Sequence, residues 1–424
     1  KNISVRPSSA IRKYQEKLVD APTAGRDLKV DFVLAGNFLI EANVMRLNIE
    51  LVDVHSNVMI WREPIEVAYE NAFKLQDIVS EKVINGLKIQ FSQDEKERIQ
   101  SNVPRNPLAY EYFLRSISYP STTGGDKLAI EMLSKSIQLD STYAPAFSEL
   151  GFRRQRYGNY GLGGEEEIKK AEQAYLKALS LNSDLVTGLW NLSILYTETA
   201  RTEEAVELAK RILQINPNSA MAHFSLGYVY RYAGMLEESE HEYDKALSLD
   251  PGNPRFRSAG LTYRCLGKYE KAFQAYDLDK GSPFSVGNLG QMSFRKGQRE
   301  QAIKYFDQLL AIEPHGAFGL LITAMKAIAM GKTEEGLRAT RKWEQTNPSD
   351  AEFWYGIAQL YGLLGDVTGC ARALQKAILL GYFNYPFMQT DAFLGPIRAH
   401  PDFRRVLAMA KEKHETFKKR FFTN

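Results

Sequence analysis

Six small residues recur in this chain at nearly fixed spacing. The intervals between them are 34, 33, 30, 34 and 34 residues, and the residues are Ala200, Gly234, Gly267, Gly297, Gly331 and Gly365. Seven positions before each marker and five positions after it, the residue is again small in every unit. A repeat of this length predicts two helices joined by a tight turn, with small residues where the helices approach closely. Such units bury their apolar faces only by stacking on their neighbours.

Particular residues give the repeat a family resemblance. Within residues 225–240, Leu226, Gly227, Tyr230 and Gly234 occupy the positions that the tetratricopeptide repeat uses for its first helix and turn. Residues 298–314 follow the pattern of its second helix and end at a proline. The chain therefore resembles a tetratricopeptide-repeat protein. That resemblance implies a mainly α fold, with a right-handed α-solenoid of about eight helix pairs over residues 101–390 and a small α/β domain before it.

The first hundred residues follow a different pattern. Residues 30–40, 44–52 and 58–61 are rich in β-branched and aromatic residues, and 45–51 alternate between apolar and polar, which is typical of a half-buried strand. An amphipathic helix is expected over residues 73–87. Residues 30–36, 45–53, Trp61 and 75–77 resemble the N-terminal domain of TolB. We therefore expect a small α/β domain over residues 1–100.

The TolB-like resemblance also implies a larger protein. In bacterial chains of this kind the domain follows a serine/threonine kinase, a nucleotide cyclase or a DNA-binding module and precedes tetratricopeptide repeats. A further strand and helix are expected before residue 1, so we expect this chain to be the C-terminal part of such a protein. The sheet edge near residues 3–6 is then a candidate for self-association.

The end of the chain is expected to close the array. Residues 391–407 resemble the end of such repeat proteins, and the helix expected at 403–417 has Phe403, Val406, Leu407 and Ala410 on one side. We interpret residues 391–424 as a capping segment that covers the last repeat.

Composition narrows the choice of partners. Because 54 basic residues are balanced by 51 acidic ones, the net charge is only +3, and no nucleic-acid partner is expected. The longest apolar stretch, residues 318–330, is too short to span a bilayer, so we expect a soluble chain without membrane insertion. Its location, in the cytoplasm or in an extracytoplasmic part of a membrane-anchored bacterial protein, stays open.

The sequence offers no motif for chemistry. The six histidines are scattered, the two cysteines lie in different units, and neither a nucleophile elbow nor a phosphate-binding loop is present. We therefore expect no catalytic residue, no metal site and no cofactor. An enzyme with a cleft built by the repeats remains an alternative.

The remaining candidate is the inner surface of the solenoid. In tetratricopeptide arrays the first helices of successive units line a concave groove, and here these positions hold aromatic, arginine and amide side chains. The predicted groove residues are Phe152, Arg156, Trp190, Asn191, Phe224, Tyr228, Arg231, Arg257, Arg264, Asn288, Gln291, Phe294, Tyr355 and Gln359. Arginine can pair with a carboxylate while rings hold apolar groups, which favours an acidic or C-terminal peptide segment. The alternative is that the aromatic residues are packing between repeats.

Together these patterns predict a non-catalytic protein-interaction region. It would bind a peptide or protein partner in the groove, as the regulatory or sensory part of a larger bacterial signalling protein. A free-standing scaffold or assembly factor is the alternative among interaction proteins. The activity of the parent protein, a kinase or a cyclase, is implied by the resemblance alone.

Overall fold

The computed structural model describes residues 19–41, 44–68, 102–161 and 163–422, and isolated positions at 6, 11, 14, 78, 81–82 and 85. The chain divides into two compact units. One consists of residues 1–108 with 250–252, and the other of residues 109–249 and 253–424. In the described part of the chain, no helix has both the length and the apolar character needed to cross a membrane.

The N-terminal unit contains an antiparallel three-stranded sheet in the order β1-β2-β3. The strands are β1 (Phe32–Glu41), β2 (Val44–Asp53) and β3 (Val58–Ala68), and helix α2 (Ala21–Leu28) precedes them. Met45, Ile49, Ile65 and Val67 form its buried cluster, so the alternation expected in the second strand is confirmed. The helix expected at 73–87 and the edge at 3–6 lie largely outside the described residues.

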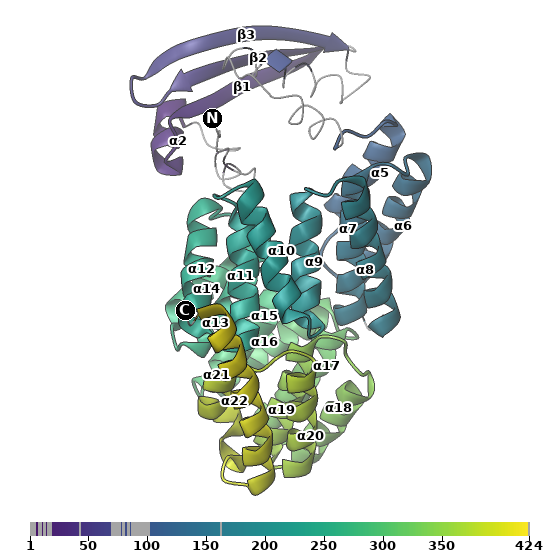
Figure 1. Cartoon of the computed structure of the whole chain (residues 1–424), viewed down its shortest axis with the longest axis vertical. Helices are drawn as coiled ribbons and strands as arrows, with labels where there is room; N and C mark the ends of the chain where they lie inside the picture. Colours follow the sequence, from purple (N-terminus) through teal and green to yellow (C-terminus); the bar gives the residue numbers. More distant parts are fainter. Residues whose placement is uncertain are drawn as a thin grey trace. The chain divides into compact units, whose positions relative to one another are not determined.

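The second unit is helical, and its helices follow one another as pairs (Figure 1). Eight pairs run from α5 to α20 in the described residues, as the repeat pattern predicts. Their bounds are α5 (Pro107–Ser118), α6 (Thr123–Leu139), α7 (Ala144–Tyr160), α8 (Gly164–Leu181), α9 (Val186–Glu198), α10 (Thr202–Ile215), α11 (Ala220–Ala233), α12 (Leu236–Leu249), α13 (Ala259–Cys265), α14 (Tyr269–Asp277), α15 (Pro283–Arg295), α16 (Arg299–Ile312), α17 (Ala317–Ala329), α18 (Thr333–Gln345), α19 (Ala351–Leu364) and α20 (Val367–Leu379). The fifth pair is the shortest, and the 3₁₀ segment η2 (Pro254–Ser258) leads into it.

The six marker residues end the first helix of their pairs in the left-handed conformation. Gly234 has φ of 80° and caps α11, with its N–H donating to Arg231 O. Ala200 takes φ of 65° at the same place in its own pair, although a Cβ makes this conformation costly. The other four markers are glycines with φ between 71° and 75°. The recurrence in the sequence therefore reflects a backbone requirement of the turn.

The small residues before the markers permit close helix packing. A Cβ added at Gly290 would lie 2.5 Å from Cε1 of Phe306, which is fully buried on the paired helix α16. Gly260 meets Tyr276 in the same way, at 2.4 Å. Each glycine thus makes room for an aromatic ring of its partner helix.

We expect Gly290→Ala to destabilise the repeat region. Pushing the Phe306 ring out of place costs about 1–3 kcal/mol, against a gain of about 1 kcal/mol in helix propensity. Gly124 of α6 is the matched control, since an added Cβ there meets no heavy atom within 4 Å. Urea unfolding should give a lower midpoint for Gly290→Ala and an unchanged or higher one for Gly124→Ala. Equal shifts would contradict the close-packing account.

Contacts between early and late pairs close the solenoid on itself. Thr123, at the start of α6, donates its N–H and hydroxyl to the Glu313 carboxylate beyond α16, at 3.1 and 3.0 Å. The rings of Tyr160 and Phe318 stack with centroids 5.0 Å apart. We call these cross-array contacts the ring closure.

The C-terminal segment completes the ring closure. It consists of α21 (Tyr385–Thr390), the 3₁₀ segment η3 (Ala392–Ile397) and α22 (Pro401–Phe422). Helix α22 packs on α20, as expected of a cap, and also reaches α11, where His414 Nδ1 lies 2.7 Å from Ala233 O. Just before α21, Phe383 N donates to Tyr232 O at 2.9 Å.

Candidate functional site

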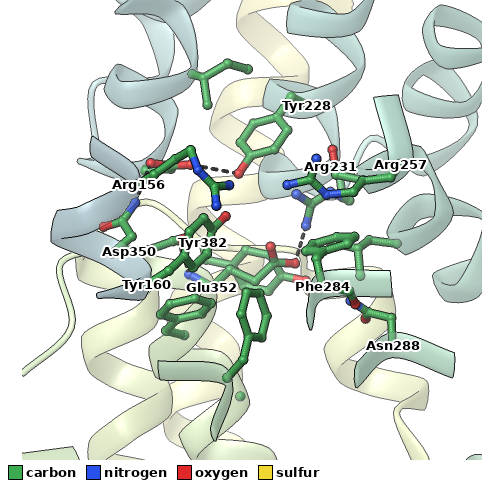
Figure 2. Close-up of a pocket in the computed structure, with 18 of the residues that line it drawn as sticks. Arg156, Tyr160, Tyr228, Arg231, Arg257, Phe284, Asn288, Asp350, Glu352 and Tyr382 are labelled. Atoms are coloured by element: carbon green, nitrogen blue, oxygen red, sulfur yellow. Dashed lines mark hydrogen bonds and ion pairs between the residues drawn. The ribbon is translucent and has the colours of Figure 1, made fainter. Parts of the chain in front are cut away.

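A cavity of about 150 Å³ lies at the centre of the repeat region. The first helices of most pairs line it, together with η2 and residues 343–382 of the late pairs. Figure 2 shows Arg156 on one side of this space and Arg231 and Arg257 together on the other, with Tyr228, Phe284 and Tyr382 around it. Its lining therefore combines aromatic rings with charged groups.

Thirteen of the fourteen predicted groove residues line this cavity. They are Phe152, Arg156, Trp190, Asn191, Phe224, Tyr228, Arg231, Arg257, Arg264, Asn288, Gln291, Tyr355 and Gln359. Phe294 lies elsewhere and packs its ring against Phe393, with centroids 5.7 Å apart. Most of the thirteen are buried, and several contact one another. The predicted groove positions thus line one cavity, which is partly open to solvent and is bordered by Tyr160 and Phe318 of the ring closure.

Other lining residues escaped the sequence analysis. Arg255 lies in η2, outside the helix periodicity, and Glu198, Asp350 and Glu352 lie at helix ends. Asp350 did carry a signal, since an aspartate two residues after Pro348 is a good helix cap, and its side chain accepts from Glu352 N at 2.8 Å. No periodic pattern marks the other three.

Two arginines of the lining have buried or nearly buried carboxylate partners. Arg156 Nε lies 3.2 Å from both carboxylate oxygens of Asp126, which also pairs with Arg153. Arg257 pairs with Asp279 at 3.2 Å and lies over the Phe284 ring. These pairs fix the guanidinium groups at the edge of the cavity and offset their charge.

Arg255 is held by rings and an amide. Its guanidinium carbon lies 3.9 Å from the ring centroid of Phe152 and 3.8 Å from that of Trp190, and Nη2 donates to Asn191 Oδ1 at 2.6 Å. Among the described residues no carboxylate lies within ion-pair distance of it. Burial lowers the pKa of Arg255 to about 10.

Arg231 and Arg264 both line the cavity. Arg231 is fully buried, forms an ion pair with Glu352, and stacks on the rings of Tyr228 and Tyr232. Arg264 Nη1 donates to Asn288 Oδ1 at 2.8 Å. No ion pair of Arg264 is found in the described part of the chain. Of these two guanidiniums, only that of Arg231 forms an ion pair in the described residues.

Two buried carboxyl groups also line the cavity and bond the tyrosines on which Arg231 stacks. Glu198 accepts from Gln155 Nε2 at 2.7 Å, Asn159 Nδ2 at 2.9 Å and Tyr228 OH at 2.9 Å. Burial nevertheless raises the pKa of Glu198 to about 7. Burial and the neighbouring Glu198 and Glu352 also raise the pKa of Asp350, which accepts from Tyr232 OH at 2.8 Å. These groups carry less negative charge than ordinary carboxylates at neutral pH.

The arrangement is suited to binding an anion. Five arginines line the cavity; Arg156, Arg231 and Arg257 pair with carboxylates, while Arg255 and Arg264 have no ion pair in the described residues. Within the described residues, no three His, Cys, Asp or Glu side chains are placed to hold a metal ion. The lining thus combines arginine N–H donors, including those of two guanidiniums unpaired in the described residues, with aromatic walls.

Different family models match the N-terminal unit and the repeat region. Residues 220–253 and 285–315 match models of the tetratricopeptide repeat. Residues 1–82 match the second domain of HilA/YgeH-like transcriptional regulators. The N-terminal match is to this family and not specifically to the TolB-like domain that the sequence resembled.

Curated relatives share parts of the chain. A putative adenylate cyclase 3 of Rhizobium meliloti is 28% identical over 141 residues, which are 32% of this chain and 24% of the relative. The type IV pilus assembly protein PilF of Pseudomonas aeruginosa is 30% identical over 131 residues, 28% of this chain and 51% of that protein. The chain thus spans about a quarter to a half of the length of these relatives.

Solved structures of repeat proteins overlap it loosely. A tetratricopeptide repeat protein from Parabacteroides merdae is 18% identical, with 72% of this chain and 100% of the other covered at a TM-score of 0.29. The P. aeruginosa pilF structure is 19% identical, with 61% and 96% covered at 0.30. Scores this low carry no argument about curvature or ligands. The C-terminal unit of this chain is thus an α-solenoid of eight helix pairs, in which residues 220–253 and 285–315 match the tetratricopeptide repeat.

Proposed function

We propose that this chain is the interaction region of a larger bacterial signalling or regulatory protein. Tetratricopeptide repeats support a role as a protein-interaction scaffold. The similarity of its N-terminal unit to a transcriptional-regulator domain, and the partial match to an adenylate cyclase, favour a regulatory parent. The activity of that parent would reside in a segment outside this chain.

The observation that carries the proposal is the lining of the solenoid interior. An acidic or C-terminal residue of a partner would find arginines, amides and aromatic rings there. The cavity is too small for an extended peptide, which spans about 3.3 Å per residue. We therefore propose that a partner inserts one carboxylate-bearing residue, or binds while the ring closure is open.

An affinity capture with matched variants tests this proposal. The chain is immobilised and exposed to extract of its native cells, and bound proteins are identified by mass spectrometry. An Arg255→Gln, Arg264→Gln double variant removes two charges that hydrogen-bond to asparagine amides, without leaving an ion-paired carboxylate unpaired. Arg211→Gln with Arg372→Gln is the control, because both side chains are about half exposed on outer helices.

The captured partners decide whether the interior is the binding surface. A partner that wild type and control retain, and that the double variant loses at unchanged thermal stability, supports recognition at the interior. If all three proteins retain the same partners, the interior is not the binding surface and the proposal fails.

A further inference from the structure

The cavity lining includes buried arginine N–H groups that lack an acceptor in the described residues. Arg231 and Arg264 both line the cavity; Arg231 pairs with Glu352, and Arg264 has no ion pair in the described residues. Three of their buried N–H groups, at Arg231 Nε and Nη2 and at Arg264 Nε, have no hydrogen-bond partner in the described residues. Such donors are costly to leave unsatisfied when they are shielded from water. An anion at this place would offset both the charge and the missing acceptors.

The other side chains of the lining limit the size and polarity of the ligand that could bind. Phe284, Leu321, Tyr355 and Tyr382 also line the cavity, and Asn288 holds Arg264 in place. An apolar cavity of about 150 Å³ holds one benzene ring. The space therefore fits a molecule with a compact apolar body, and a planar carboxylate matches the guanidinium fork.

We propose that the cavity is a binding site for a free small organic acid, one carboxylate on a compact aromatic or branched apolar body, with its carboxylate between Arg231 and Arg264. The bound acid joins the fourth and fifth pairs to the late pairs and so stabilises the ring closure. It also competes with a protein partner for the interior, and this last point alone rests on the proposed function.

Titration calorimetry of the whole chain with benzoate tests the site. We expect saturable binding of one benzoate and a raised melting temperature. Benzyl alcohol has a similar body without the carboxylate and should bind about tenfold more weakly or worse. If benzoate does not bind at concentrations of about 1 mM, or if the alcohol binds equally well, the inference is wrong.

Variants locate the binding. Arg264→Gln should weaken benzoate at least about tenfold with unchanged circular dichroism, whereas Arg372→Gln on α20 should bind as wild type does. Leu321→Phe, which fills the apolar part of the cavity, is the second variant if Arg264→Gln fails to fold, and it too should lose benzoate. Unchanged affinity in a folded cavity variant would place benzoate elsewhere and overturn the inference.

Two further ligands distinguish the source of the anion. Binding of inorganic phosphate without benzoate would replace the organic acid with a phosphate site. A short peptide with a free C-terminal phenylalanine is the second ligand. If it binds, while the same peptide with an amidated C-terminus and benzoate do not, the carboxylate belongs to a protein partner. If benzoate binds but the arginine double variant captures the same partners as wild type, this inference holds and the proposed function fails. If benzoate does not bind but the double variant loses a partner, the proposed function holds and this inference fails.

Discussion

Asp391→Ala is expected to lower the free energy of unfolding by about 3–5 kcal/mol, because it leaves a buried guanidinium without its counter-ion. Asp391 is fully buried and pairs with Arg295 at 2.6 Å. Tyr355 OH and Gln359 Nε2 donate to the same carboxylate at 2.6 and 2.5 Å. The side chain thereby ties η3 to α15 and α19, two helices that line the cavity. Its loss should loosen the C-terminal part of the ring closure.

The pH dependence of this contribution has a definite sign. Burial acts to raise the pKa of Asp391, but Arg295 and the hydrogen bonds more than offset it, so the pKa is below 3.8. The ionised form is therefore the one that the fold favours. This stabilisation is present above about pH 4 and is lost as the pH falls through the pKa of the folded state.

Urea unfolding at pH 7 measures the effect. Asp402→Ala is the matched control, since Asp402 is half exposed on α22 and its ion pair with Arg405 spans 3.9 Å. Exposed pairs contribute at most about 1 kcal/mol, so this control should unfold close to wild type. An Asp391→Ala protein as stable as the control would show that the buried pair does not hold the segment in place.

Glu198→Gln is expected to stabilise the chain above neutral pH. The pKa of Glu198 is raised from 4.5 to about 7, so the fold favours the protonated form. The contribution of Glu198 to the free energy of unfolding is then fully present below about pH 4.5. It is lost as the pH rises to about 7 and is not regained above that pH. At one pKa unit per about 1.4 kcal/mol, the loss is about 3 kcal/mol. Glutamine keeps an acceptor for Gln155 and Asn159 and carries no charge.

Unfolding midpoints at pH 4 and pH 8 test this expectation. Wild type and variant should be similar at pH 4, and the variant should be more stable at pH 8. Asp350 retains part of the pH dependence, because burial raises its pKa as well. The exposed Glu203→Gln on α10 is a control that should change neither midpoint. Parallel curves for wild type and Glu198→Gln would contradict the raised pKa.

Much of the repeat region could be predicted because its constraints are local. The turn at Gly234 needs a left-handed residue, and the packing at Gly290 needs a small one, so both leave a periodic trace in the sequence. The same periodicity indicates which side of each first helix faces inward. Thirteen of the positions that this periodicity indicates line the cavity.

The closure could not be predicted, because it depends on contacts between distant repeats. Tyr232 and Asp350 are 118 residues apart, and Thr123 and Glu313 are 190 apart. Small crossing angles accumulate over the array, and nothing in one repeat specifies their sum. In the N-terminal unit, α2 was missed although Asp20 caps it and a proline opens its first turn, which is a recognisable start signal.

The central claim is that the solenoid closes around its interior, and a short cross-link between the first and sixth pairs tests it most directly. Thr123 Oγ1 lies 3.0 Å from Glu313 Oε1, so cysteines at both positions should lie within reach of a short bis-maleimide cross-linker. The account predicts that Thr123→Cys with Glu313→Cys is cross-linked within one chain. Single variants should not be, since Cys265 is half-buried and Cys370 buried. A folded double variant in which the two introduced cysteines react with the cross-linker only one at a time would show an open array and contradict the ring closure.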